Sequence, residues 1–378
     1  MKILYCIPTL EIGGAERQLS YLATEMLRHG HDVHVASVRG GENRERLEEA
    51  GVVLHDLAGS GKKDFRVVPK LVGLMRALKA DVVQTTLARM DVAGGSAALY
   101  TRTPWILREA SSAPEHADDP MSWIRRLLAR RADAIVSNSQ NGDDYWRSVA
   151  RRKRHVIRNG VPFAEFAAGP PQQAPHTPTI LFAGRLDEGK NVATLIHALG
   201  RLAGQLEFTA LIAGDGSLRE ELQRLATACG IAHRVSFIGT QPTIVELLRR
   251  ADLAVSLSRW EGCPNFVLEA MASGAPLVLS DIPAHRELLD ERGARFVPAQ
   301  DAVAAAEAIL TTLRSAGSGR ERNLVAREMA AARSIESMAA RYAEIYDAVR
   351  LNRRVASGAR RKTVADAERT GRSLPENP

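Results

Sequence analysis

Two carboxylates stand eight residues apart in the segment EGCPNFVLEAMASG, which covers residues 261–274. Carboxylates accept hydrogen bonds and protons, so a fixed pair can bind a polar ligand or exchange a proton with it. The Pro-Asn pair before the apolar run indicates the start of a helix, and Gly274 indicates its end. Glu269, early in that helix, complements the helix dipole, whereas Glu261 precedes the turn and gains nothing from it. A solvated loop side chain is the alternative interpretation of Glu261.

The segment GGAER (residues 13–17) follows the first apolar run and opens a helical pattern. Backbone amides at a helix N-terminus can face an anion, and Gly13 and Gly14 would let a ligand approach closely. A plain tight turn is the alternative interpretation.

Two further loops follow apolar runs, GRLDEGKN (184–191) and GDG (214–216). The first holds two fixed positive charges, although a basic loop taken singly is usually just solvated. Together with GGAER and the segment from Glu261, these make four loops on one side of an expected cleft. Their cations, glycines and helix N-terminus predict a site that binds a diphosphate. Besides the glutamates, the candidate residues in these loops are Gly13, Gly14, Gly184, Arg185, Lys190, Asp215 and Gly216.

Short apolar runs alternate with helical patterns along most of the chain. Runs that are apolar throughout and separated by helices indicate parallel strands covered on both faces. We therefore predict an α/β fold with two facing, doubly wound Rossmann-like domains and a cleft between them. Ligands of such sheets bind at the carboxyl ends of the strands, so the cleft is the expected site. The predicted strands cover residues 2–8, 32–38, 81–86, 104–109, 134–139, 179–183, 208–213, 234–239, 252–258 and 275–280.

Composition divides the chain into segments. Residues 164–178 are rich in Pro, Ala and Gln and have no periodicity, which is typical of a linker. Residues 350–378 hold eight Lys/Arg against three acidic residues, which accounts for five of the seven net positive charges. This stretch has few large apolar residues, which predicts disorder. The predicted segments are an N-terminal domain (1–163), a linker (164–178), a C-terminal domain (179–335), a helix that packs back on the N-terminal domain (336–350) and a disordered basic tail (351–378).

The overall composition excludes several classes of protein. The chain is 45% hydrophobic and 25% charged, as is usual for soluble globular proteins, and no apolar run approaches the roughly 20 residues of a membrane span. Three widely spaced cysteines fit a reducing, cytoplasmic compartment rather than a disulfide framework or a zinc site. No basic stripe carries interleaved aromatics, so nucleic acid is not an expected partner. No Asp-x-Asp pair is present, so no bound metal is expected.

Five segments occur in order along the chain: GGAERQLSYLATEML, NGV (159–161), FAGRLDEGKN, LIAGDGSLREELQ and EGCPNFVLEAMASGAPLVLSD. Together they resemble the family-4 (group 1) retaining glycosyltransferases of the GT-B fold, from Met1 to about residue 350. The two glutamates with GRL and KN are the most specific part of this resemblance. It implies a retaining transfer from a nucleotide diphosphate sugar, with a UDP-sugar favoured, and neither a catalytic metal nor another cofactor.

The resemblance also implies a role for each charged position. Arg185 and Lys190 hold the diphosphate and stabilise the charge that develops on it as the glycosidic bond breaks. Glu261 binds hydroxyls of the donor sugar, and Glu269 binds the ribose hydroxyls. The other implied donor contacts come from the backbone amides of Asn265 and Phe266 and from Gly14.

The chain departs from this family in the first domain, which is expected to bind the acceptor. Many relatives carry a histidine after the fourth strand or near the end of the next, and this chain has none in either place. Asp91 or Glu109 could take a proton-accepting or charge-stabilising role, with a surface or structural role as the favoured alternative for each. In a retaining front-face mechanism the departing phosphate itself can accept the proton, so the missing histidine weakens an acceptor assignment more than the activity.

The implied acceptor is a glycan or a polyprenyl- or lipid-linked sugar, as in the synthesis of cell-envelope polysaccharide or glycolipid. A protein that binds nucleotide sugars without transferring them, or a nucleotide-sugar epimerase, is the alternative. Hydrolysis of the donor would separate an enzyme from a pure binding protein.

The segment SWIRRLLARRADAI (122–135) spaces Trp123 and Leu127 at a helical interval, with arginines beside them. A basic helix with Trp and Leu on one face can lie in the headgroup region of anionic lipid, which predicts peripheral binding to the inner face of the cell membrane. The alternative is an ordinary domain helix whose apolar stripe faces the core.

Overall fold

The computed structural model describes residues 1–57, 66–111, 120–149, 153–166, 177–315 and 320–370. Its first seven strands form one sheet with the order β3-β2-β1-β4-β5-β6-β7, and every pairing is parallel. This order places the switch in chain direction between β1 and β4, as in a doubly wound sheet. The strands are β1 (Lys2–Thr9), β2 (Asp32–Arg39), β3 (Val53–Asp56), β4 (Val82–Thr86), β5 (Trp105–Glu109), β6 (Ala134–Ser137) and β7 (Arg154–Val156).

Helices cover both faces of this sheet, which explains why its central strands are buried on both sides. Along β1, Ile3 and Tyr5 belong to one buried cluster, whereas Leu4 and Cys6 belong to the cluster on the opposite face. Side chains alternate between the two faces of a strand, so a strand covered on both sides buries consecutive residues and is mostly apolar. The covering helices are α1 (Gly14–Arg28), α2 (Asn43–Glu49), α3 (Val67–Leu78), α4 (Ala88–Thr101), α5 (Pro120–Ala129) and α6 (Gln140–Trp146).

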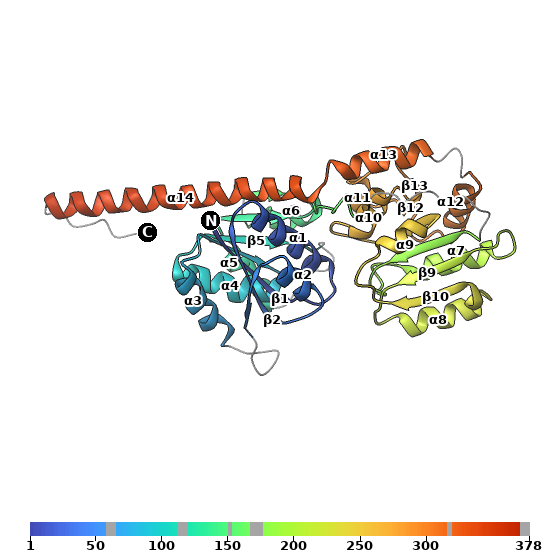
Figure 1. The fold of residues 1–378 in the computed structure, drawn as a ribbon, viewed down its shortest axis with the longest axis horizontal. Helices are drawn as coiled ribbons and strands as arrows, with labels where there is room; N and C mark the ends of the chain where they lie inside the picture. The colour runs from blue at the N-terminus through green and yellow to red at the C-terminus, as the bar shows by residue number, and fades with distance from the viewer. Residues whose placement is uncertain (58–65, 112–119, 150–152, 167–176, 316–319, 371–378) are drawn as a thin grey trace.

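The second domain repeats the arrangement with six parallel strands in the order β10-β9-β8-β11-β12-β13. Its strands are β8 (Thr179–Ala183), β9 (Thr209–Ala213), β10 (Val235–Gly239), β11 (Leu253–Ser256), β12 (Leu277–Ser280) and β13 (Arg295–Val297). Its helices are α7 (Val192–Leu202), α8 (Arg219–Ala228), the 3₁₀ helix η2 (Ala232–Arg234), α9 (Val245–Arg250), α10 (Asn265–Ser273), α11 (Pro283–Arg286), α12 (Ala302–Arg314) and α13 (Arg320–Ala331). The prediction of two doubly wound domains is confirmed (Figure 1).

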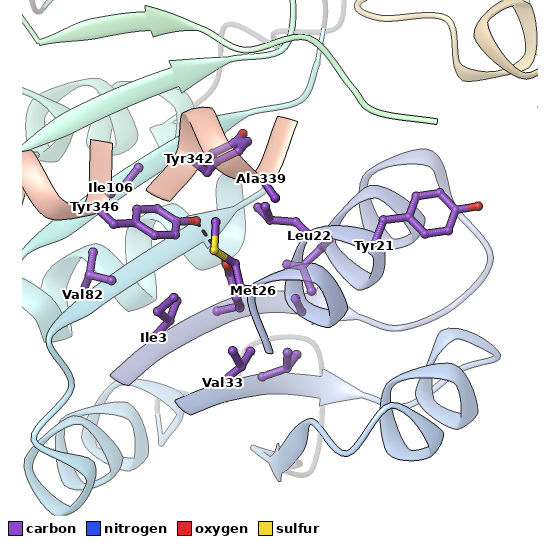
Figure 2. Packing of buried hydrophobic residues seen from close by; sticks show 14 of the residues in the cluster. Ile3, Tyr21, Leu22, Met26, Val33, Val82, Ile106, Ala339, Tyr342 and Tyr346 are labelled. Carbon is purple, nitrogen blue, oxygen red and sulfur yellow. Dashed lines mark hydrogen bonds between the residues drawn. The ribbon is translucent and has the colours of Figure 1, made fainter. Parts of the chain in front are cut away.

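The last helix, α14 (Ile335–Thr370), returns from the second domain to the first and lies along it (Figure 1). Its buried side chains join the same cluster as α1 and β1. Figure 2 shows Tyr346 projecting from α14 toward Met26, and Tyr342 on the same helix belongs to the same cluster. The Tyr346 hydroxyl also donates a hydrogen bond of 2.6 Å to the Gln84 side chain on β4. The C-terminal helix is therefore part of the N-terminal core.

The predicted break between a helix over 336–350 and a disordered tail from 351 differs from the structure, in which one helix continues to Thr370. Residues 351–370 contain Ala, Arg, Lys and Glu and no proline. These residues favour helix, and extending an existing helix costs far less than starting one. The terminal stretch with its two prolines, 371–378, lies outside the described residues, as does most of the predicted linker.

Candidate active site

Two neighbouring strands of the second sheet, β8 and β11, end in loops that bring Lys190 and Glu261 together. The Lys190 Nζ atom lies 2.5 Å from Oε1 of Glu261, although 71 positions separate the two residues in the sequence. Parallel strands deliver their carboxyl ends to the same edge of a sheet, which is why loops so distant in sequence can meet. Two of the three predicted catalytic residues thus form one ion pair.

The direction of Lys190 is set by the residue that follows it. Asn191 adopts a positive φ of 53°, a conformation that asparagine tolerates better than most residues. Its side-chain amide donates to the carbonyls of Leu257, at 2.9 Å, and Ala299, at 2.6 Å. The side-chain oxygen of Asn191 accepts a hydrogen bond of 3.0 Å from the Thr194 hydroxyl. The loop is thereby tied to the strand ends around it, and Lys190 leaves it in a fixed direction.

Glu261 is held as a carboxylate. Burial alone would raise the pKa of Glu261, but the attraction of Lys190 and hydrogen bonds from Lys190 and Ser258 outweigh burial and lower that pKa below its ordinary value. The Ser258 hydroxyl donates at 2.7 Å. His285, which is fully buried and electrostatically coupled to Glu261, has its own pKa lowered by burial, and its Nδ1 atom lies 2.8 Å from the carbonyl of Ser280. The His285 imidazole near the Lys190–Glu261 pair is therefore neutral.

Glu269 lies at the boundary between the domains. Its side chain is 3% exposed, and its Oε1 atom lies 2.8 Å from NH2 of Arg17 on α1 of the first domain. Within the part of the chain that the structure describes, neither carboxylate oxygen accepts a hydrogen bond. Burial raises the pKa of Glu269, and Arg17 opposes that rise. A buried carboxylate with two such oxygens suits a ligand that brings its own donors.

The N-termini of α1 and α10 meet across the domain boundary. The Asn265 side chain, at the first position of α10, donates to the Gly14 carbonyl at 3.3 Å and accepts a 2.7 Å hydrogen bond from Asn159. A Cβ atom on Gly14 would come within 2.8 Å of the Asn265 amide nitrogen, so a larger residue there would displace the Asn265 side chain. Neither helix terminus is capped by a side chain. Both positive ends of the helix dipoles are thus directed at one place, which favours an anion.

The remaining charged candidates lie farther toward the solvent. The Arg185 side chain is 70% exposed, and its Nε atom lies 3.2 Å from Asp187 in the same loop. Arg185 also lowers the pKa of Glu16 on α1, although burial makes that pKa higher than usual overall, so Arg185 faces the first domain. Asp215 is exposed and pairs at 3.2 Å with Arg219, one turn farther along the chain.

The candidate glycines and Phe266 serve the packing of the loops. A Cβ atom on Gly216 would lie 2.4 Å from the Leu186 carbonyl oxygen, so the loops after β8 and β9 can touch only with glycine there. Gly184 faces the Lys190 side chain, and Gly13 faces the Glu16 carboxylate. Phe266 packs in the second domain's core, which leaves its backbone amide as the group that can reach a ligand.

Asp91 and Glu109 lie inside the first domain, on either side of Arg125. Arg125 contacts Asp91 Oδ2 at 2.7 Å and Glu109 Oε2 at 2.9 Å. The Thr85 hydroxyl donates to Asp91 at 2.6 Å, and the Trp146 indole donates to Glu109 at 3.0 Å. These contacts favour the structural alternative for both acids.

Three functional candidates escaped the reading of the sequence. Arg17 was visible in the GGAER segment, but only the structure places it against Glu269. Arg108 is buried and donates at 3.1 Å to Asn159, the residue that holds Asn265. His285 gives no sequence signal, because only the folded structure buries it near Glu261.

No group of three His, Cys, Asp or Glu side chains that could hold a metal ion occurs among the described residues. A cavity of 710 Å³ lies where α14 crosses the amino ends of β6 and β7, and its lining contains none of Arg17, Lys190, Glu261 and Glu269. Two of its lining residues, Asp133 and Arg353, already bind each other through two hydrogen bonds of 2.7 and 2.8 Å. We therefore place the chemistry at the domain boundary and not in this cavity.

Two family models match the chain. The model described as Glycosyltransferase Family 4 matches residues 12–165, and the model described as Glycosyl transferases group 1 matches residues 177–315. The first match covers the sheet that carries Arg17, and the second covers the sheet that carries Lys190, Glu261 and Glu269.

Relatives of known name and structure agree with these matches. An α-1,4-N-acetyl-D-galactosaminyltransferase of Campylobacter jejuni, which acts on an undecaprenol-diphosphate-linked sugar, is 27% identical over 72% of this chain and 77% of its own. A GDP-mannose:cellobiosyl-diphosphopolyprenol α-mannosyltransferase of Xanthomonas campestris is 31% identical over 49% of this chain and 50% of its own. The crystal structure of Anabaena Alr3699/HepE with UDP-glucose superposes with a TM-score of 0.83 at 23% identity, over 92% of this chain and 100% of that one.

Two doubly wound domains with their charged strand ends at a common boundary define the GT-B class of fold. The chain belongs to the group 1 glycosyltransferases of that fold, and the resemblance seen in the sequence is confirmed.

Proposed function

We propose that this glycosyltransferase moves a sugar, with retention of anomeric configuration, from a nucleotide diphosphate sugar to a glycan or lipid-linked acceptor. The observation that carries the proposal is the Lys190–Glu261 pair beside the two uncapped helix N-termini. A cation and helix dipoles stabilise a departing diphosphate, and a carboxylate held in its ionised form accepts hydrogen bonds from sugar hydroxyls. We favour a UDP-sugar because the structural relative HepE binds UDP-glucose, although another relative uses GDP-mannose.

In this proposal, different residues of the site contact the diphosphate, the sugar and the ribose of the donor. Lys190 and Arg185 neutralise the diphosphate, Glu261 orients the sugar, and the ribose hydroxyls donate to Glu269. The amides at the start of α10 and the Gly13–Gly14 turn close the anion site from both domains. The departing phosphate takes the acceptor's proton, so no histidine base and no metal ion is required.

Titration with nucleotide sugars tests this donor assignment. Thermal shifts with UDP-, GDP- and ADP-sugars should identify one nucleotide that stabilises the protein, since a bound ligand raises stability by mass action. The same titration in excess chelator should give an unchanged affinity. Loss of binding in chelator would mean that a metal holds the diphosphate, and release of free sugar without transfer would favour a protein that only binds or hydrolyses the donor.

We further propose that the acceptor lies at a membrane surface, and helix α5 supports this. Trp123 is 66% exposed, and Ile124 and Leu127 are exposed beside it, whereas Arg125, 4% exposed, and Ala129 are buried. Three apolar residues of the helix therefore face outward while Leu128 packs against the core, which differs from the ordinary arrangement of a domain helix. Three exposed arginines flank these outward-facing residues, and each contributes about 1 kcal/mol near an anionic surface. These residues are Arg126, Arg130 and Arg131.

No helix in the described part of the chain is long and apolar enough to span a bilayer. The named relatives act on undecaprenol- and polyprenol-diphosphate-linked sugars, which are anchored in a membrane, and this favours a lipid-linked acceptor here.

Sedimentation with vesicles tests the membrane proposal. The protein should pellet with anionic vesicles at low salt and far less at high salt or with neutral vesicles. A variant with Trp123→Ala and Leu127→Ala should lose this binding. The matched control replaces two exposed apolar residues of the other domain, Val303→Ala and Leu324→Ala, and should keep it. Equal, negligible pelleting with both kinds of vesicle would favour a soluble acceptor.

A further inference from the structure

The contact between Arg17 and Glu269 compensates charge without using the carboxylate's hydrogen-bonding capacity. The atoms NH2 and Oε1 are 2.8 Å apart, yet their geometry is not that of a hydrogen bond, and the Arg17 Nε atom has no partner among the described residues. A guanidinium that served only to fix a carboxylate would form the paired hydrogen bonds that Arg and Glu favour. Both oxygens of Glu269 instead remain able to accept hydrogen bonds from another group.

We infer that Arg17 is a positioning residue of the nucleotide site, which reaches across the domain boundary to compensate the charge of Glu269 so that both of its oxygens can bind the ribose diol. The inference rests on the proposed function, because it needs a nucleotide at Glu269. Two vicinal hydroxyls supply the two donors that a buried carboxylate requires. Arg17 belongs to α1, so this half of the donor site is complete only when the two domains are together.

The surroundings of Glu269 show why it needs this cation. Burial is the largest influence on the pKa of Glu269 and raises it, and Glu165 raises it further. Arg17 opposes both. Tyr21 also faces the carboxylate, and Arg46, which lies 4.3 Å from the centre of the Tyr21 ring, is paired with Glu165 at 3.0 Å. Without Arg17, Glu269 would take up a proton at a higher pH than it does now.

A protonated Glu269 has lost part of its capacity to accept two hydroxyl donors, which gives the inference a pH signature. In Arg17→Met the pKa of Glu269 rises, so the carboxyl is protonated below that pKa and nucleotide affinity falls as the pH is lowered. Comparing variant and unchanged protein at each pH removes the ionisation of the phosphates from the comparison, because it is common to both.

Calorimetric titration with UDP, GDP and ADP from pH 6 to pH 8.5 tests this directly. Arg17→Met should weaken binding of the preferred nucleotide by at least about tenfold at pH 6 and by less at pH 8.5. Tenfold is the scale of losing one hydrogen bond from a ribose hydroxyl to the ionised Glu269. Arg17→Lys, which keeps the charge, should bind within a few-fold of the unchanged protein. The matched control is Arg28→Met on the same helix, where the side chain is exposed and pairs only within its own turn.

A second variant tests that Glu269 is the group that titrates. Adding Glu269→Gln to Arg17→Met removes the ionisable group, so the pH dependence of the affinity ratio should disappear. Equal affinity and an equal pH profile for Arg17→Met and the unchanged protein would overturn the inference and leave the proposed function standing. Tighter binding by Arg17→Met at every pH would also overturn it, because Arg17 would then be a plug that the nucleotide must displace. An unchanged protein that bound none of the three nucleotides would overturn the proposed function together with the inference.

Discussion

The charges around Arg125 in the first domain and those at Glu269 on the domain boundary are both buried, and they differ in how completely the carboxylates are hydrogen-bonded. In the first domain, Arg125 lies between Asp91 and Glu109. All four carboxylate oxygens there have partners. Asp91 accepts hydrogen bonds from Thr85 and Arg125. Glu109 accepts them from the Ser111 amide and Trp146 and is paired with Arg125. At the domain boundary, Glu269 forms an ion pair with Arg17, and neither of its oxygens accepts a hydrogen bond from the residues that the structure describes.

We infer that this difference separates a structural charge from one that can bind a ligand. A saturated network has no capacity left for a ligand, and its members stabilise the core only while all of them are present. An unsaturated carboxylate costs free energy until a ligand supplies donors. The amino-acid types are the same in both places, so the partners of each oxygen, rather than the residue types, distinguish the two roles.

The largest effect should follow from breaking the saturated network. Arg125→Met leaves two carboxylates buried without their cation and should lower the free energy of unfolding by about 3–5 kcal/mol. Urea unfolding at neutral pH measures this loss. The matched control is Arg126→Met, one position along α5, where the side chain is exposed and the change should stay within about 0.5 kcal/mol. Equal stabilities of the two variants would contradict a structural role for the network.

Breaking the Lys190–Glu261 pair should affect activity more than folding. Lys190→Ala or Glu261→Ala should each cost at least about 2–4 kcal/mol of transition-state stabilisation, because each removes a preorganised charge beside the reacting bond. The measurement is kcat/KM with donor and acceptor supplied. Lys2→Ala, which removes an exposed lysine from a surface ion pair, should leave kcat/KM unchanged. Near-normal turnover of either active-site variant would remove this pair from the mechanism.

A smaller effect concerns the pH dependence of stability. Burial, opposed by Arg125 and aided by Glu109, raises the pKa of Asp91 from 3.8 to about 6. Between these values the folded protein binds more protons at Asp91 than the unfolded chain does, so stability should fall as the pH rises from about 4 to 6, by at most about 1.4 kcal/mol per pH unit. Urea unfolding across this range should show a shallower fall for Asp91→Asn. Parallel curves for the two proteins would mean that Asp91 has an ordinary pKa in the folded state.

Much of this protein could be predicted from the sequence, because the signals were local. Strands covered on both faces are buried at nearly every position, as β1 and β4 are, and the consecutive apolar residues of β1 carry this signal in the sequence. The loops GGAER, GRLDEGKN and EGCPNFVLE follow such strands, and parallel strands bring their carboxyl ends to one edge. The fold, the family and the placing of the charged loops therefore followed from the sequence alone.

Only the tertiary structure decided which charges meet and which faces are buried. The helical spacing of Trp123 and Leu127 defines a stripe on α5, but the acids that bury Arg125 come from α4 and β5, and they turn that stripe outward. In the same way, Arg17 meets Glu269 only because two separate domains pack together, and α14 adds its tyrosines to a core that begins more than 300 residues earlier in the sequence. A pattern within one segment indicates the structure that its own residues favour. Whether a buried charge stabilises or destabilises the fold depends on partners that no local pattern contains.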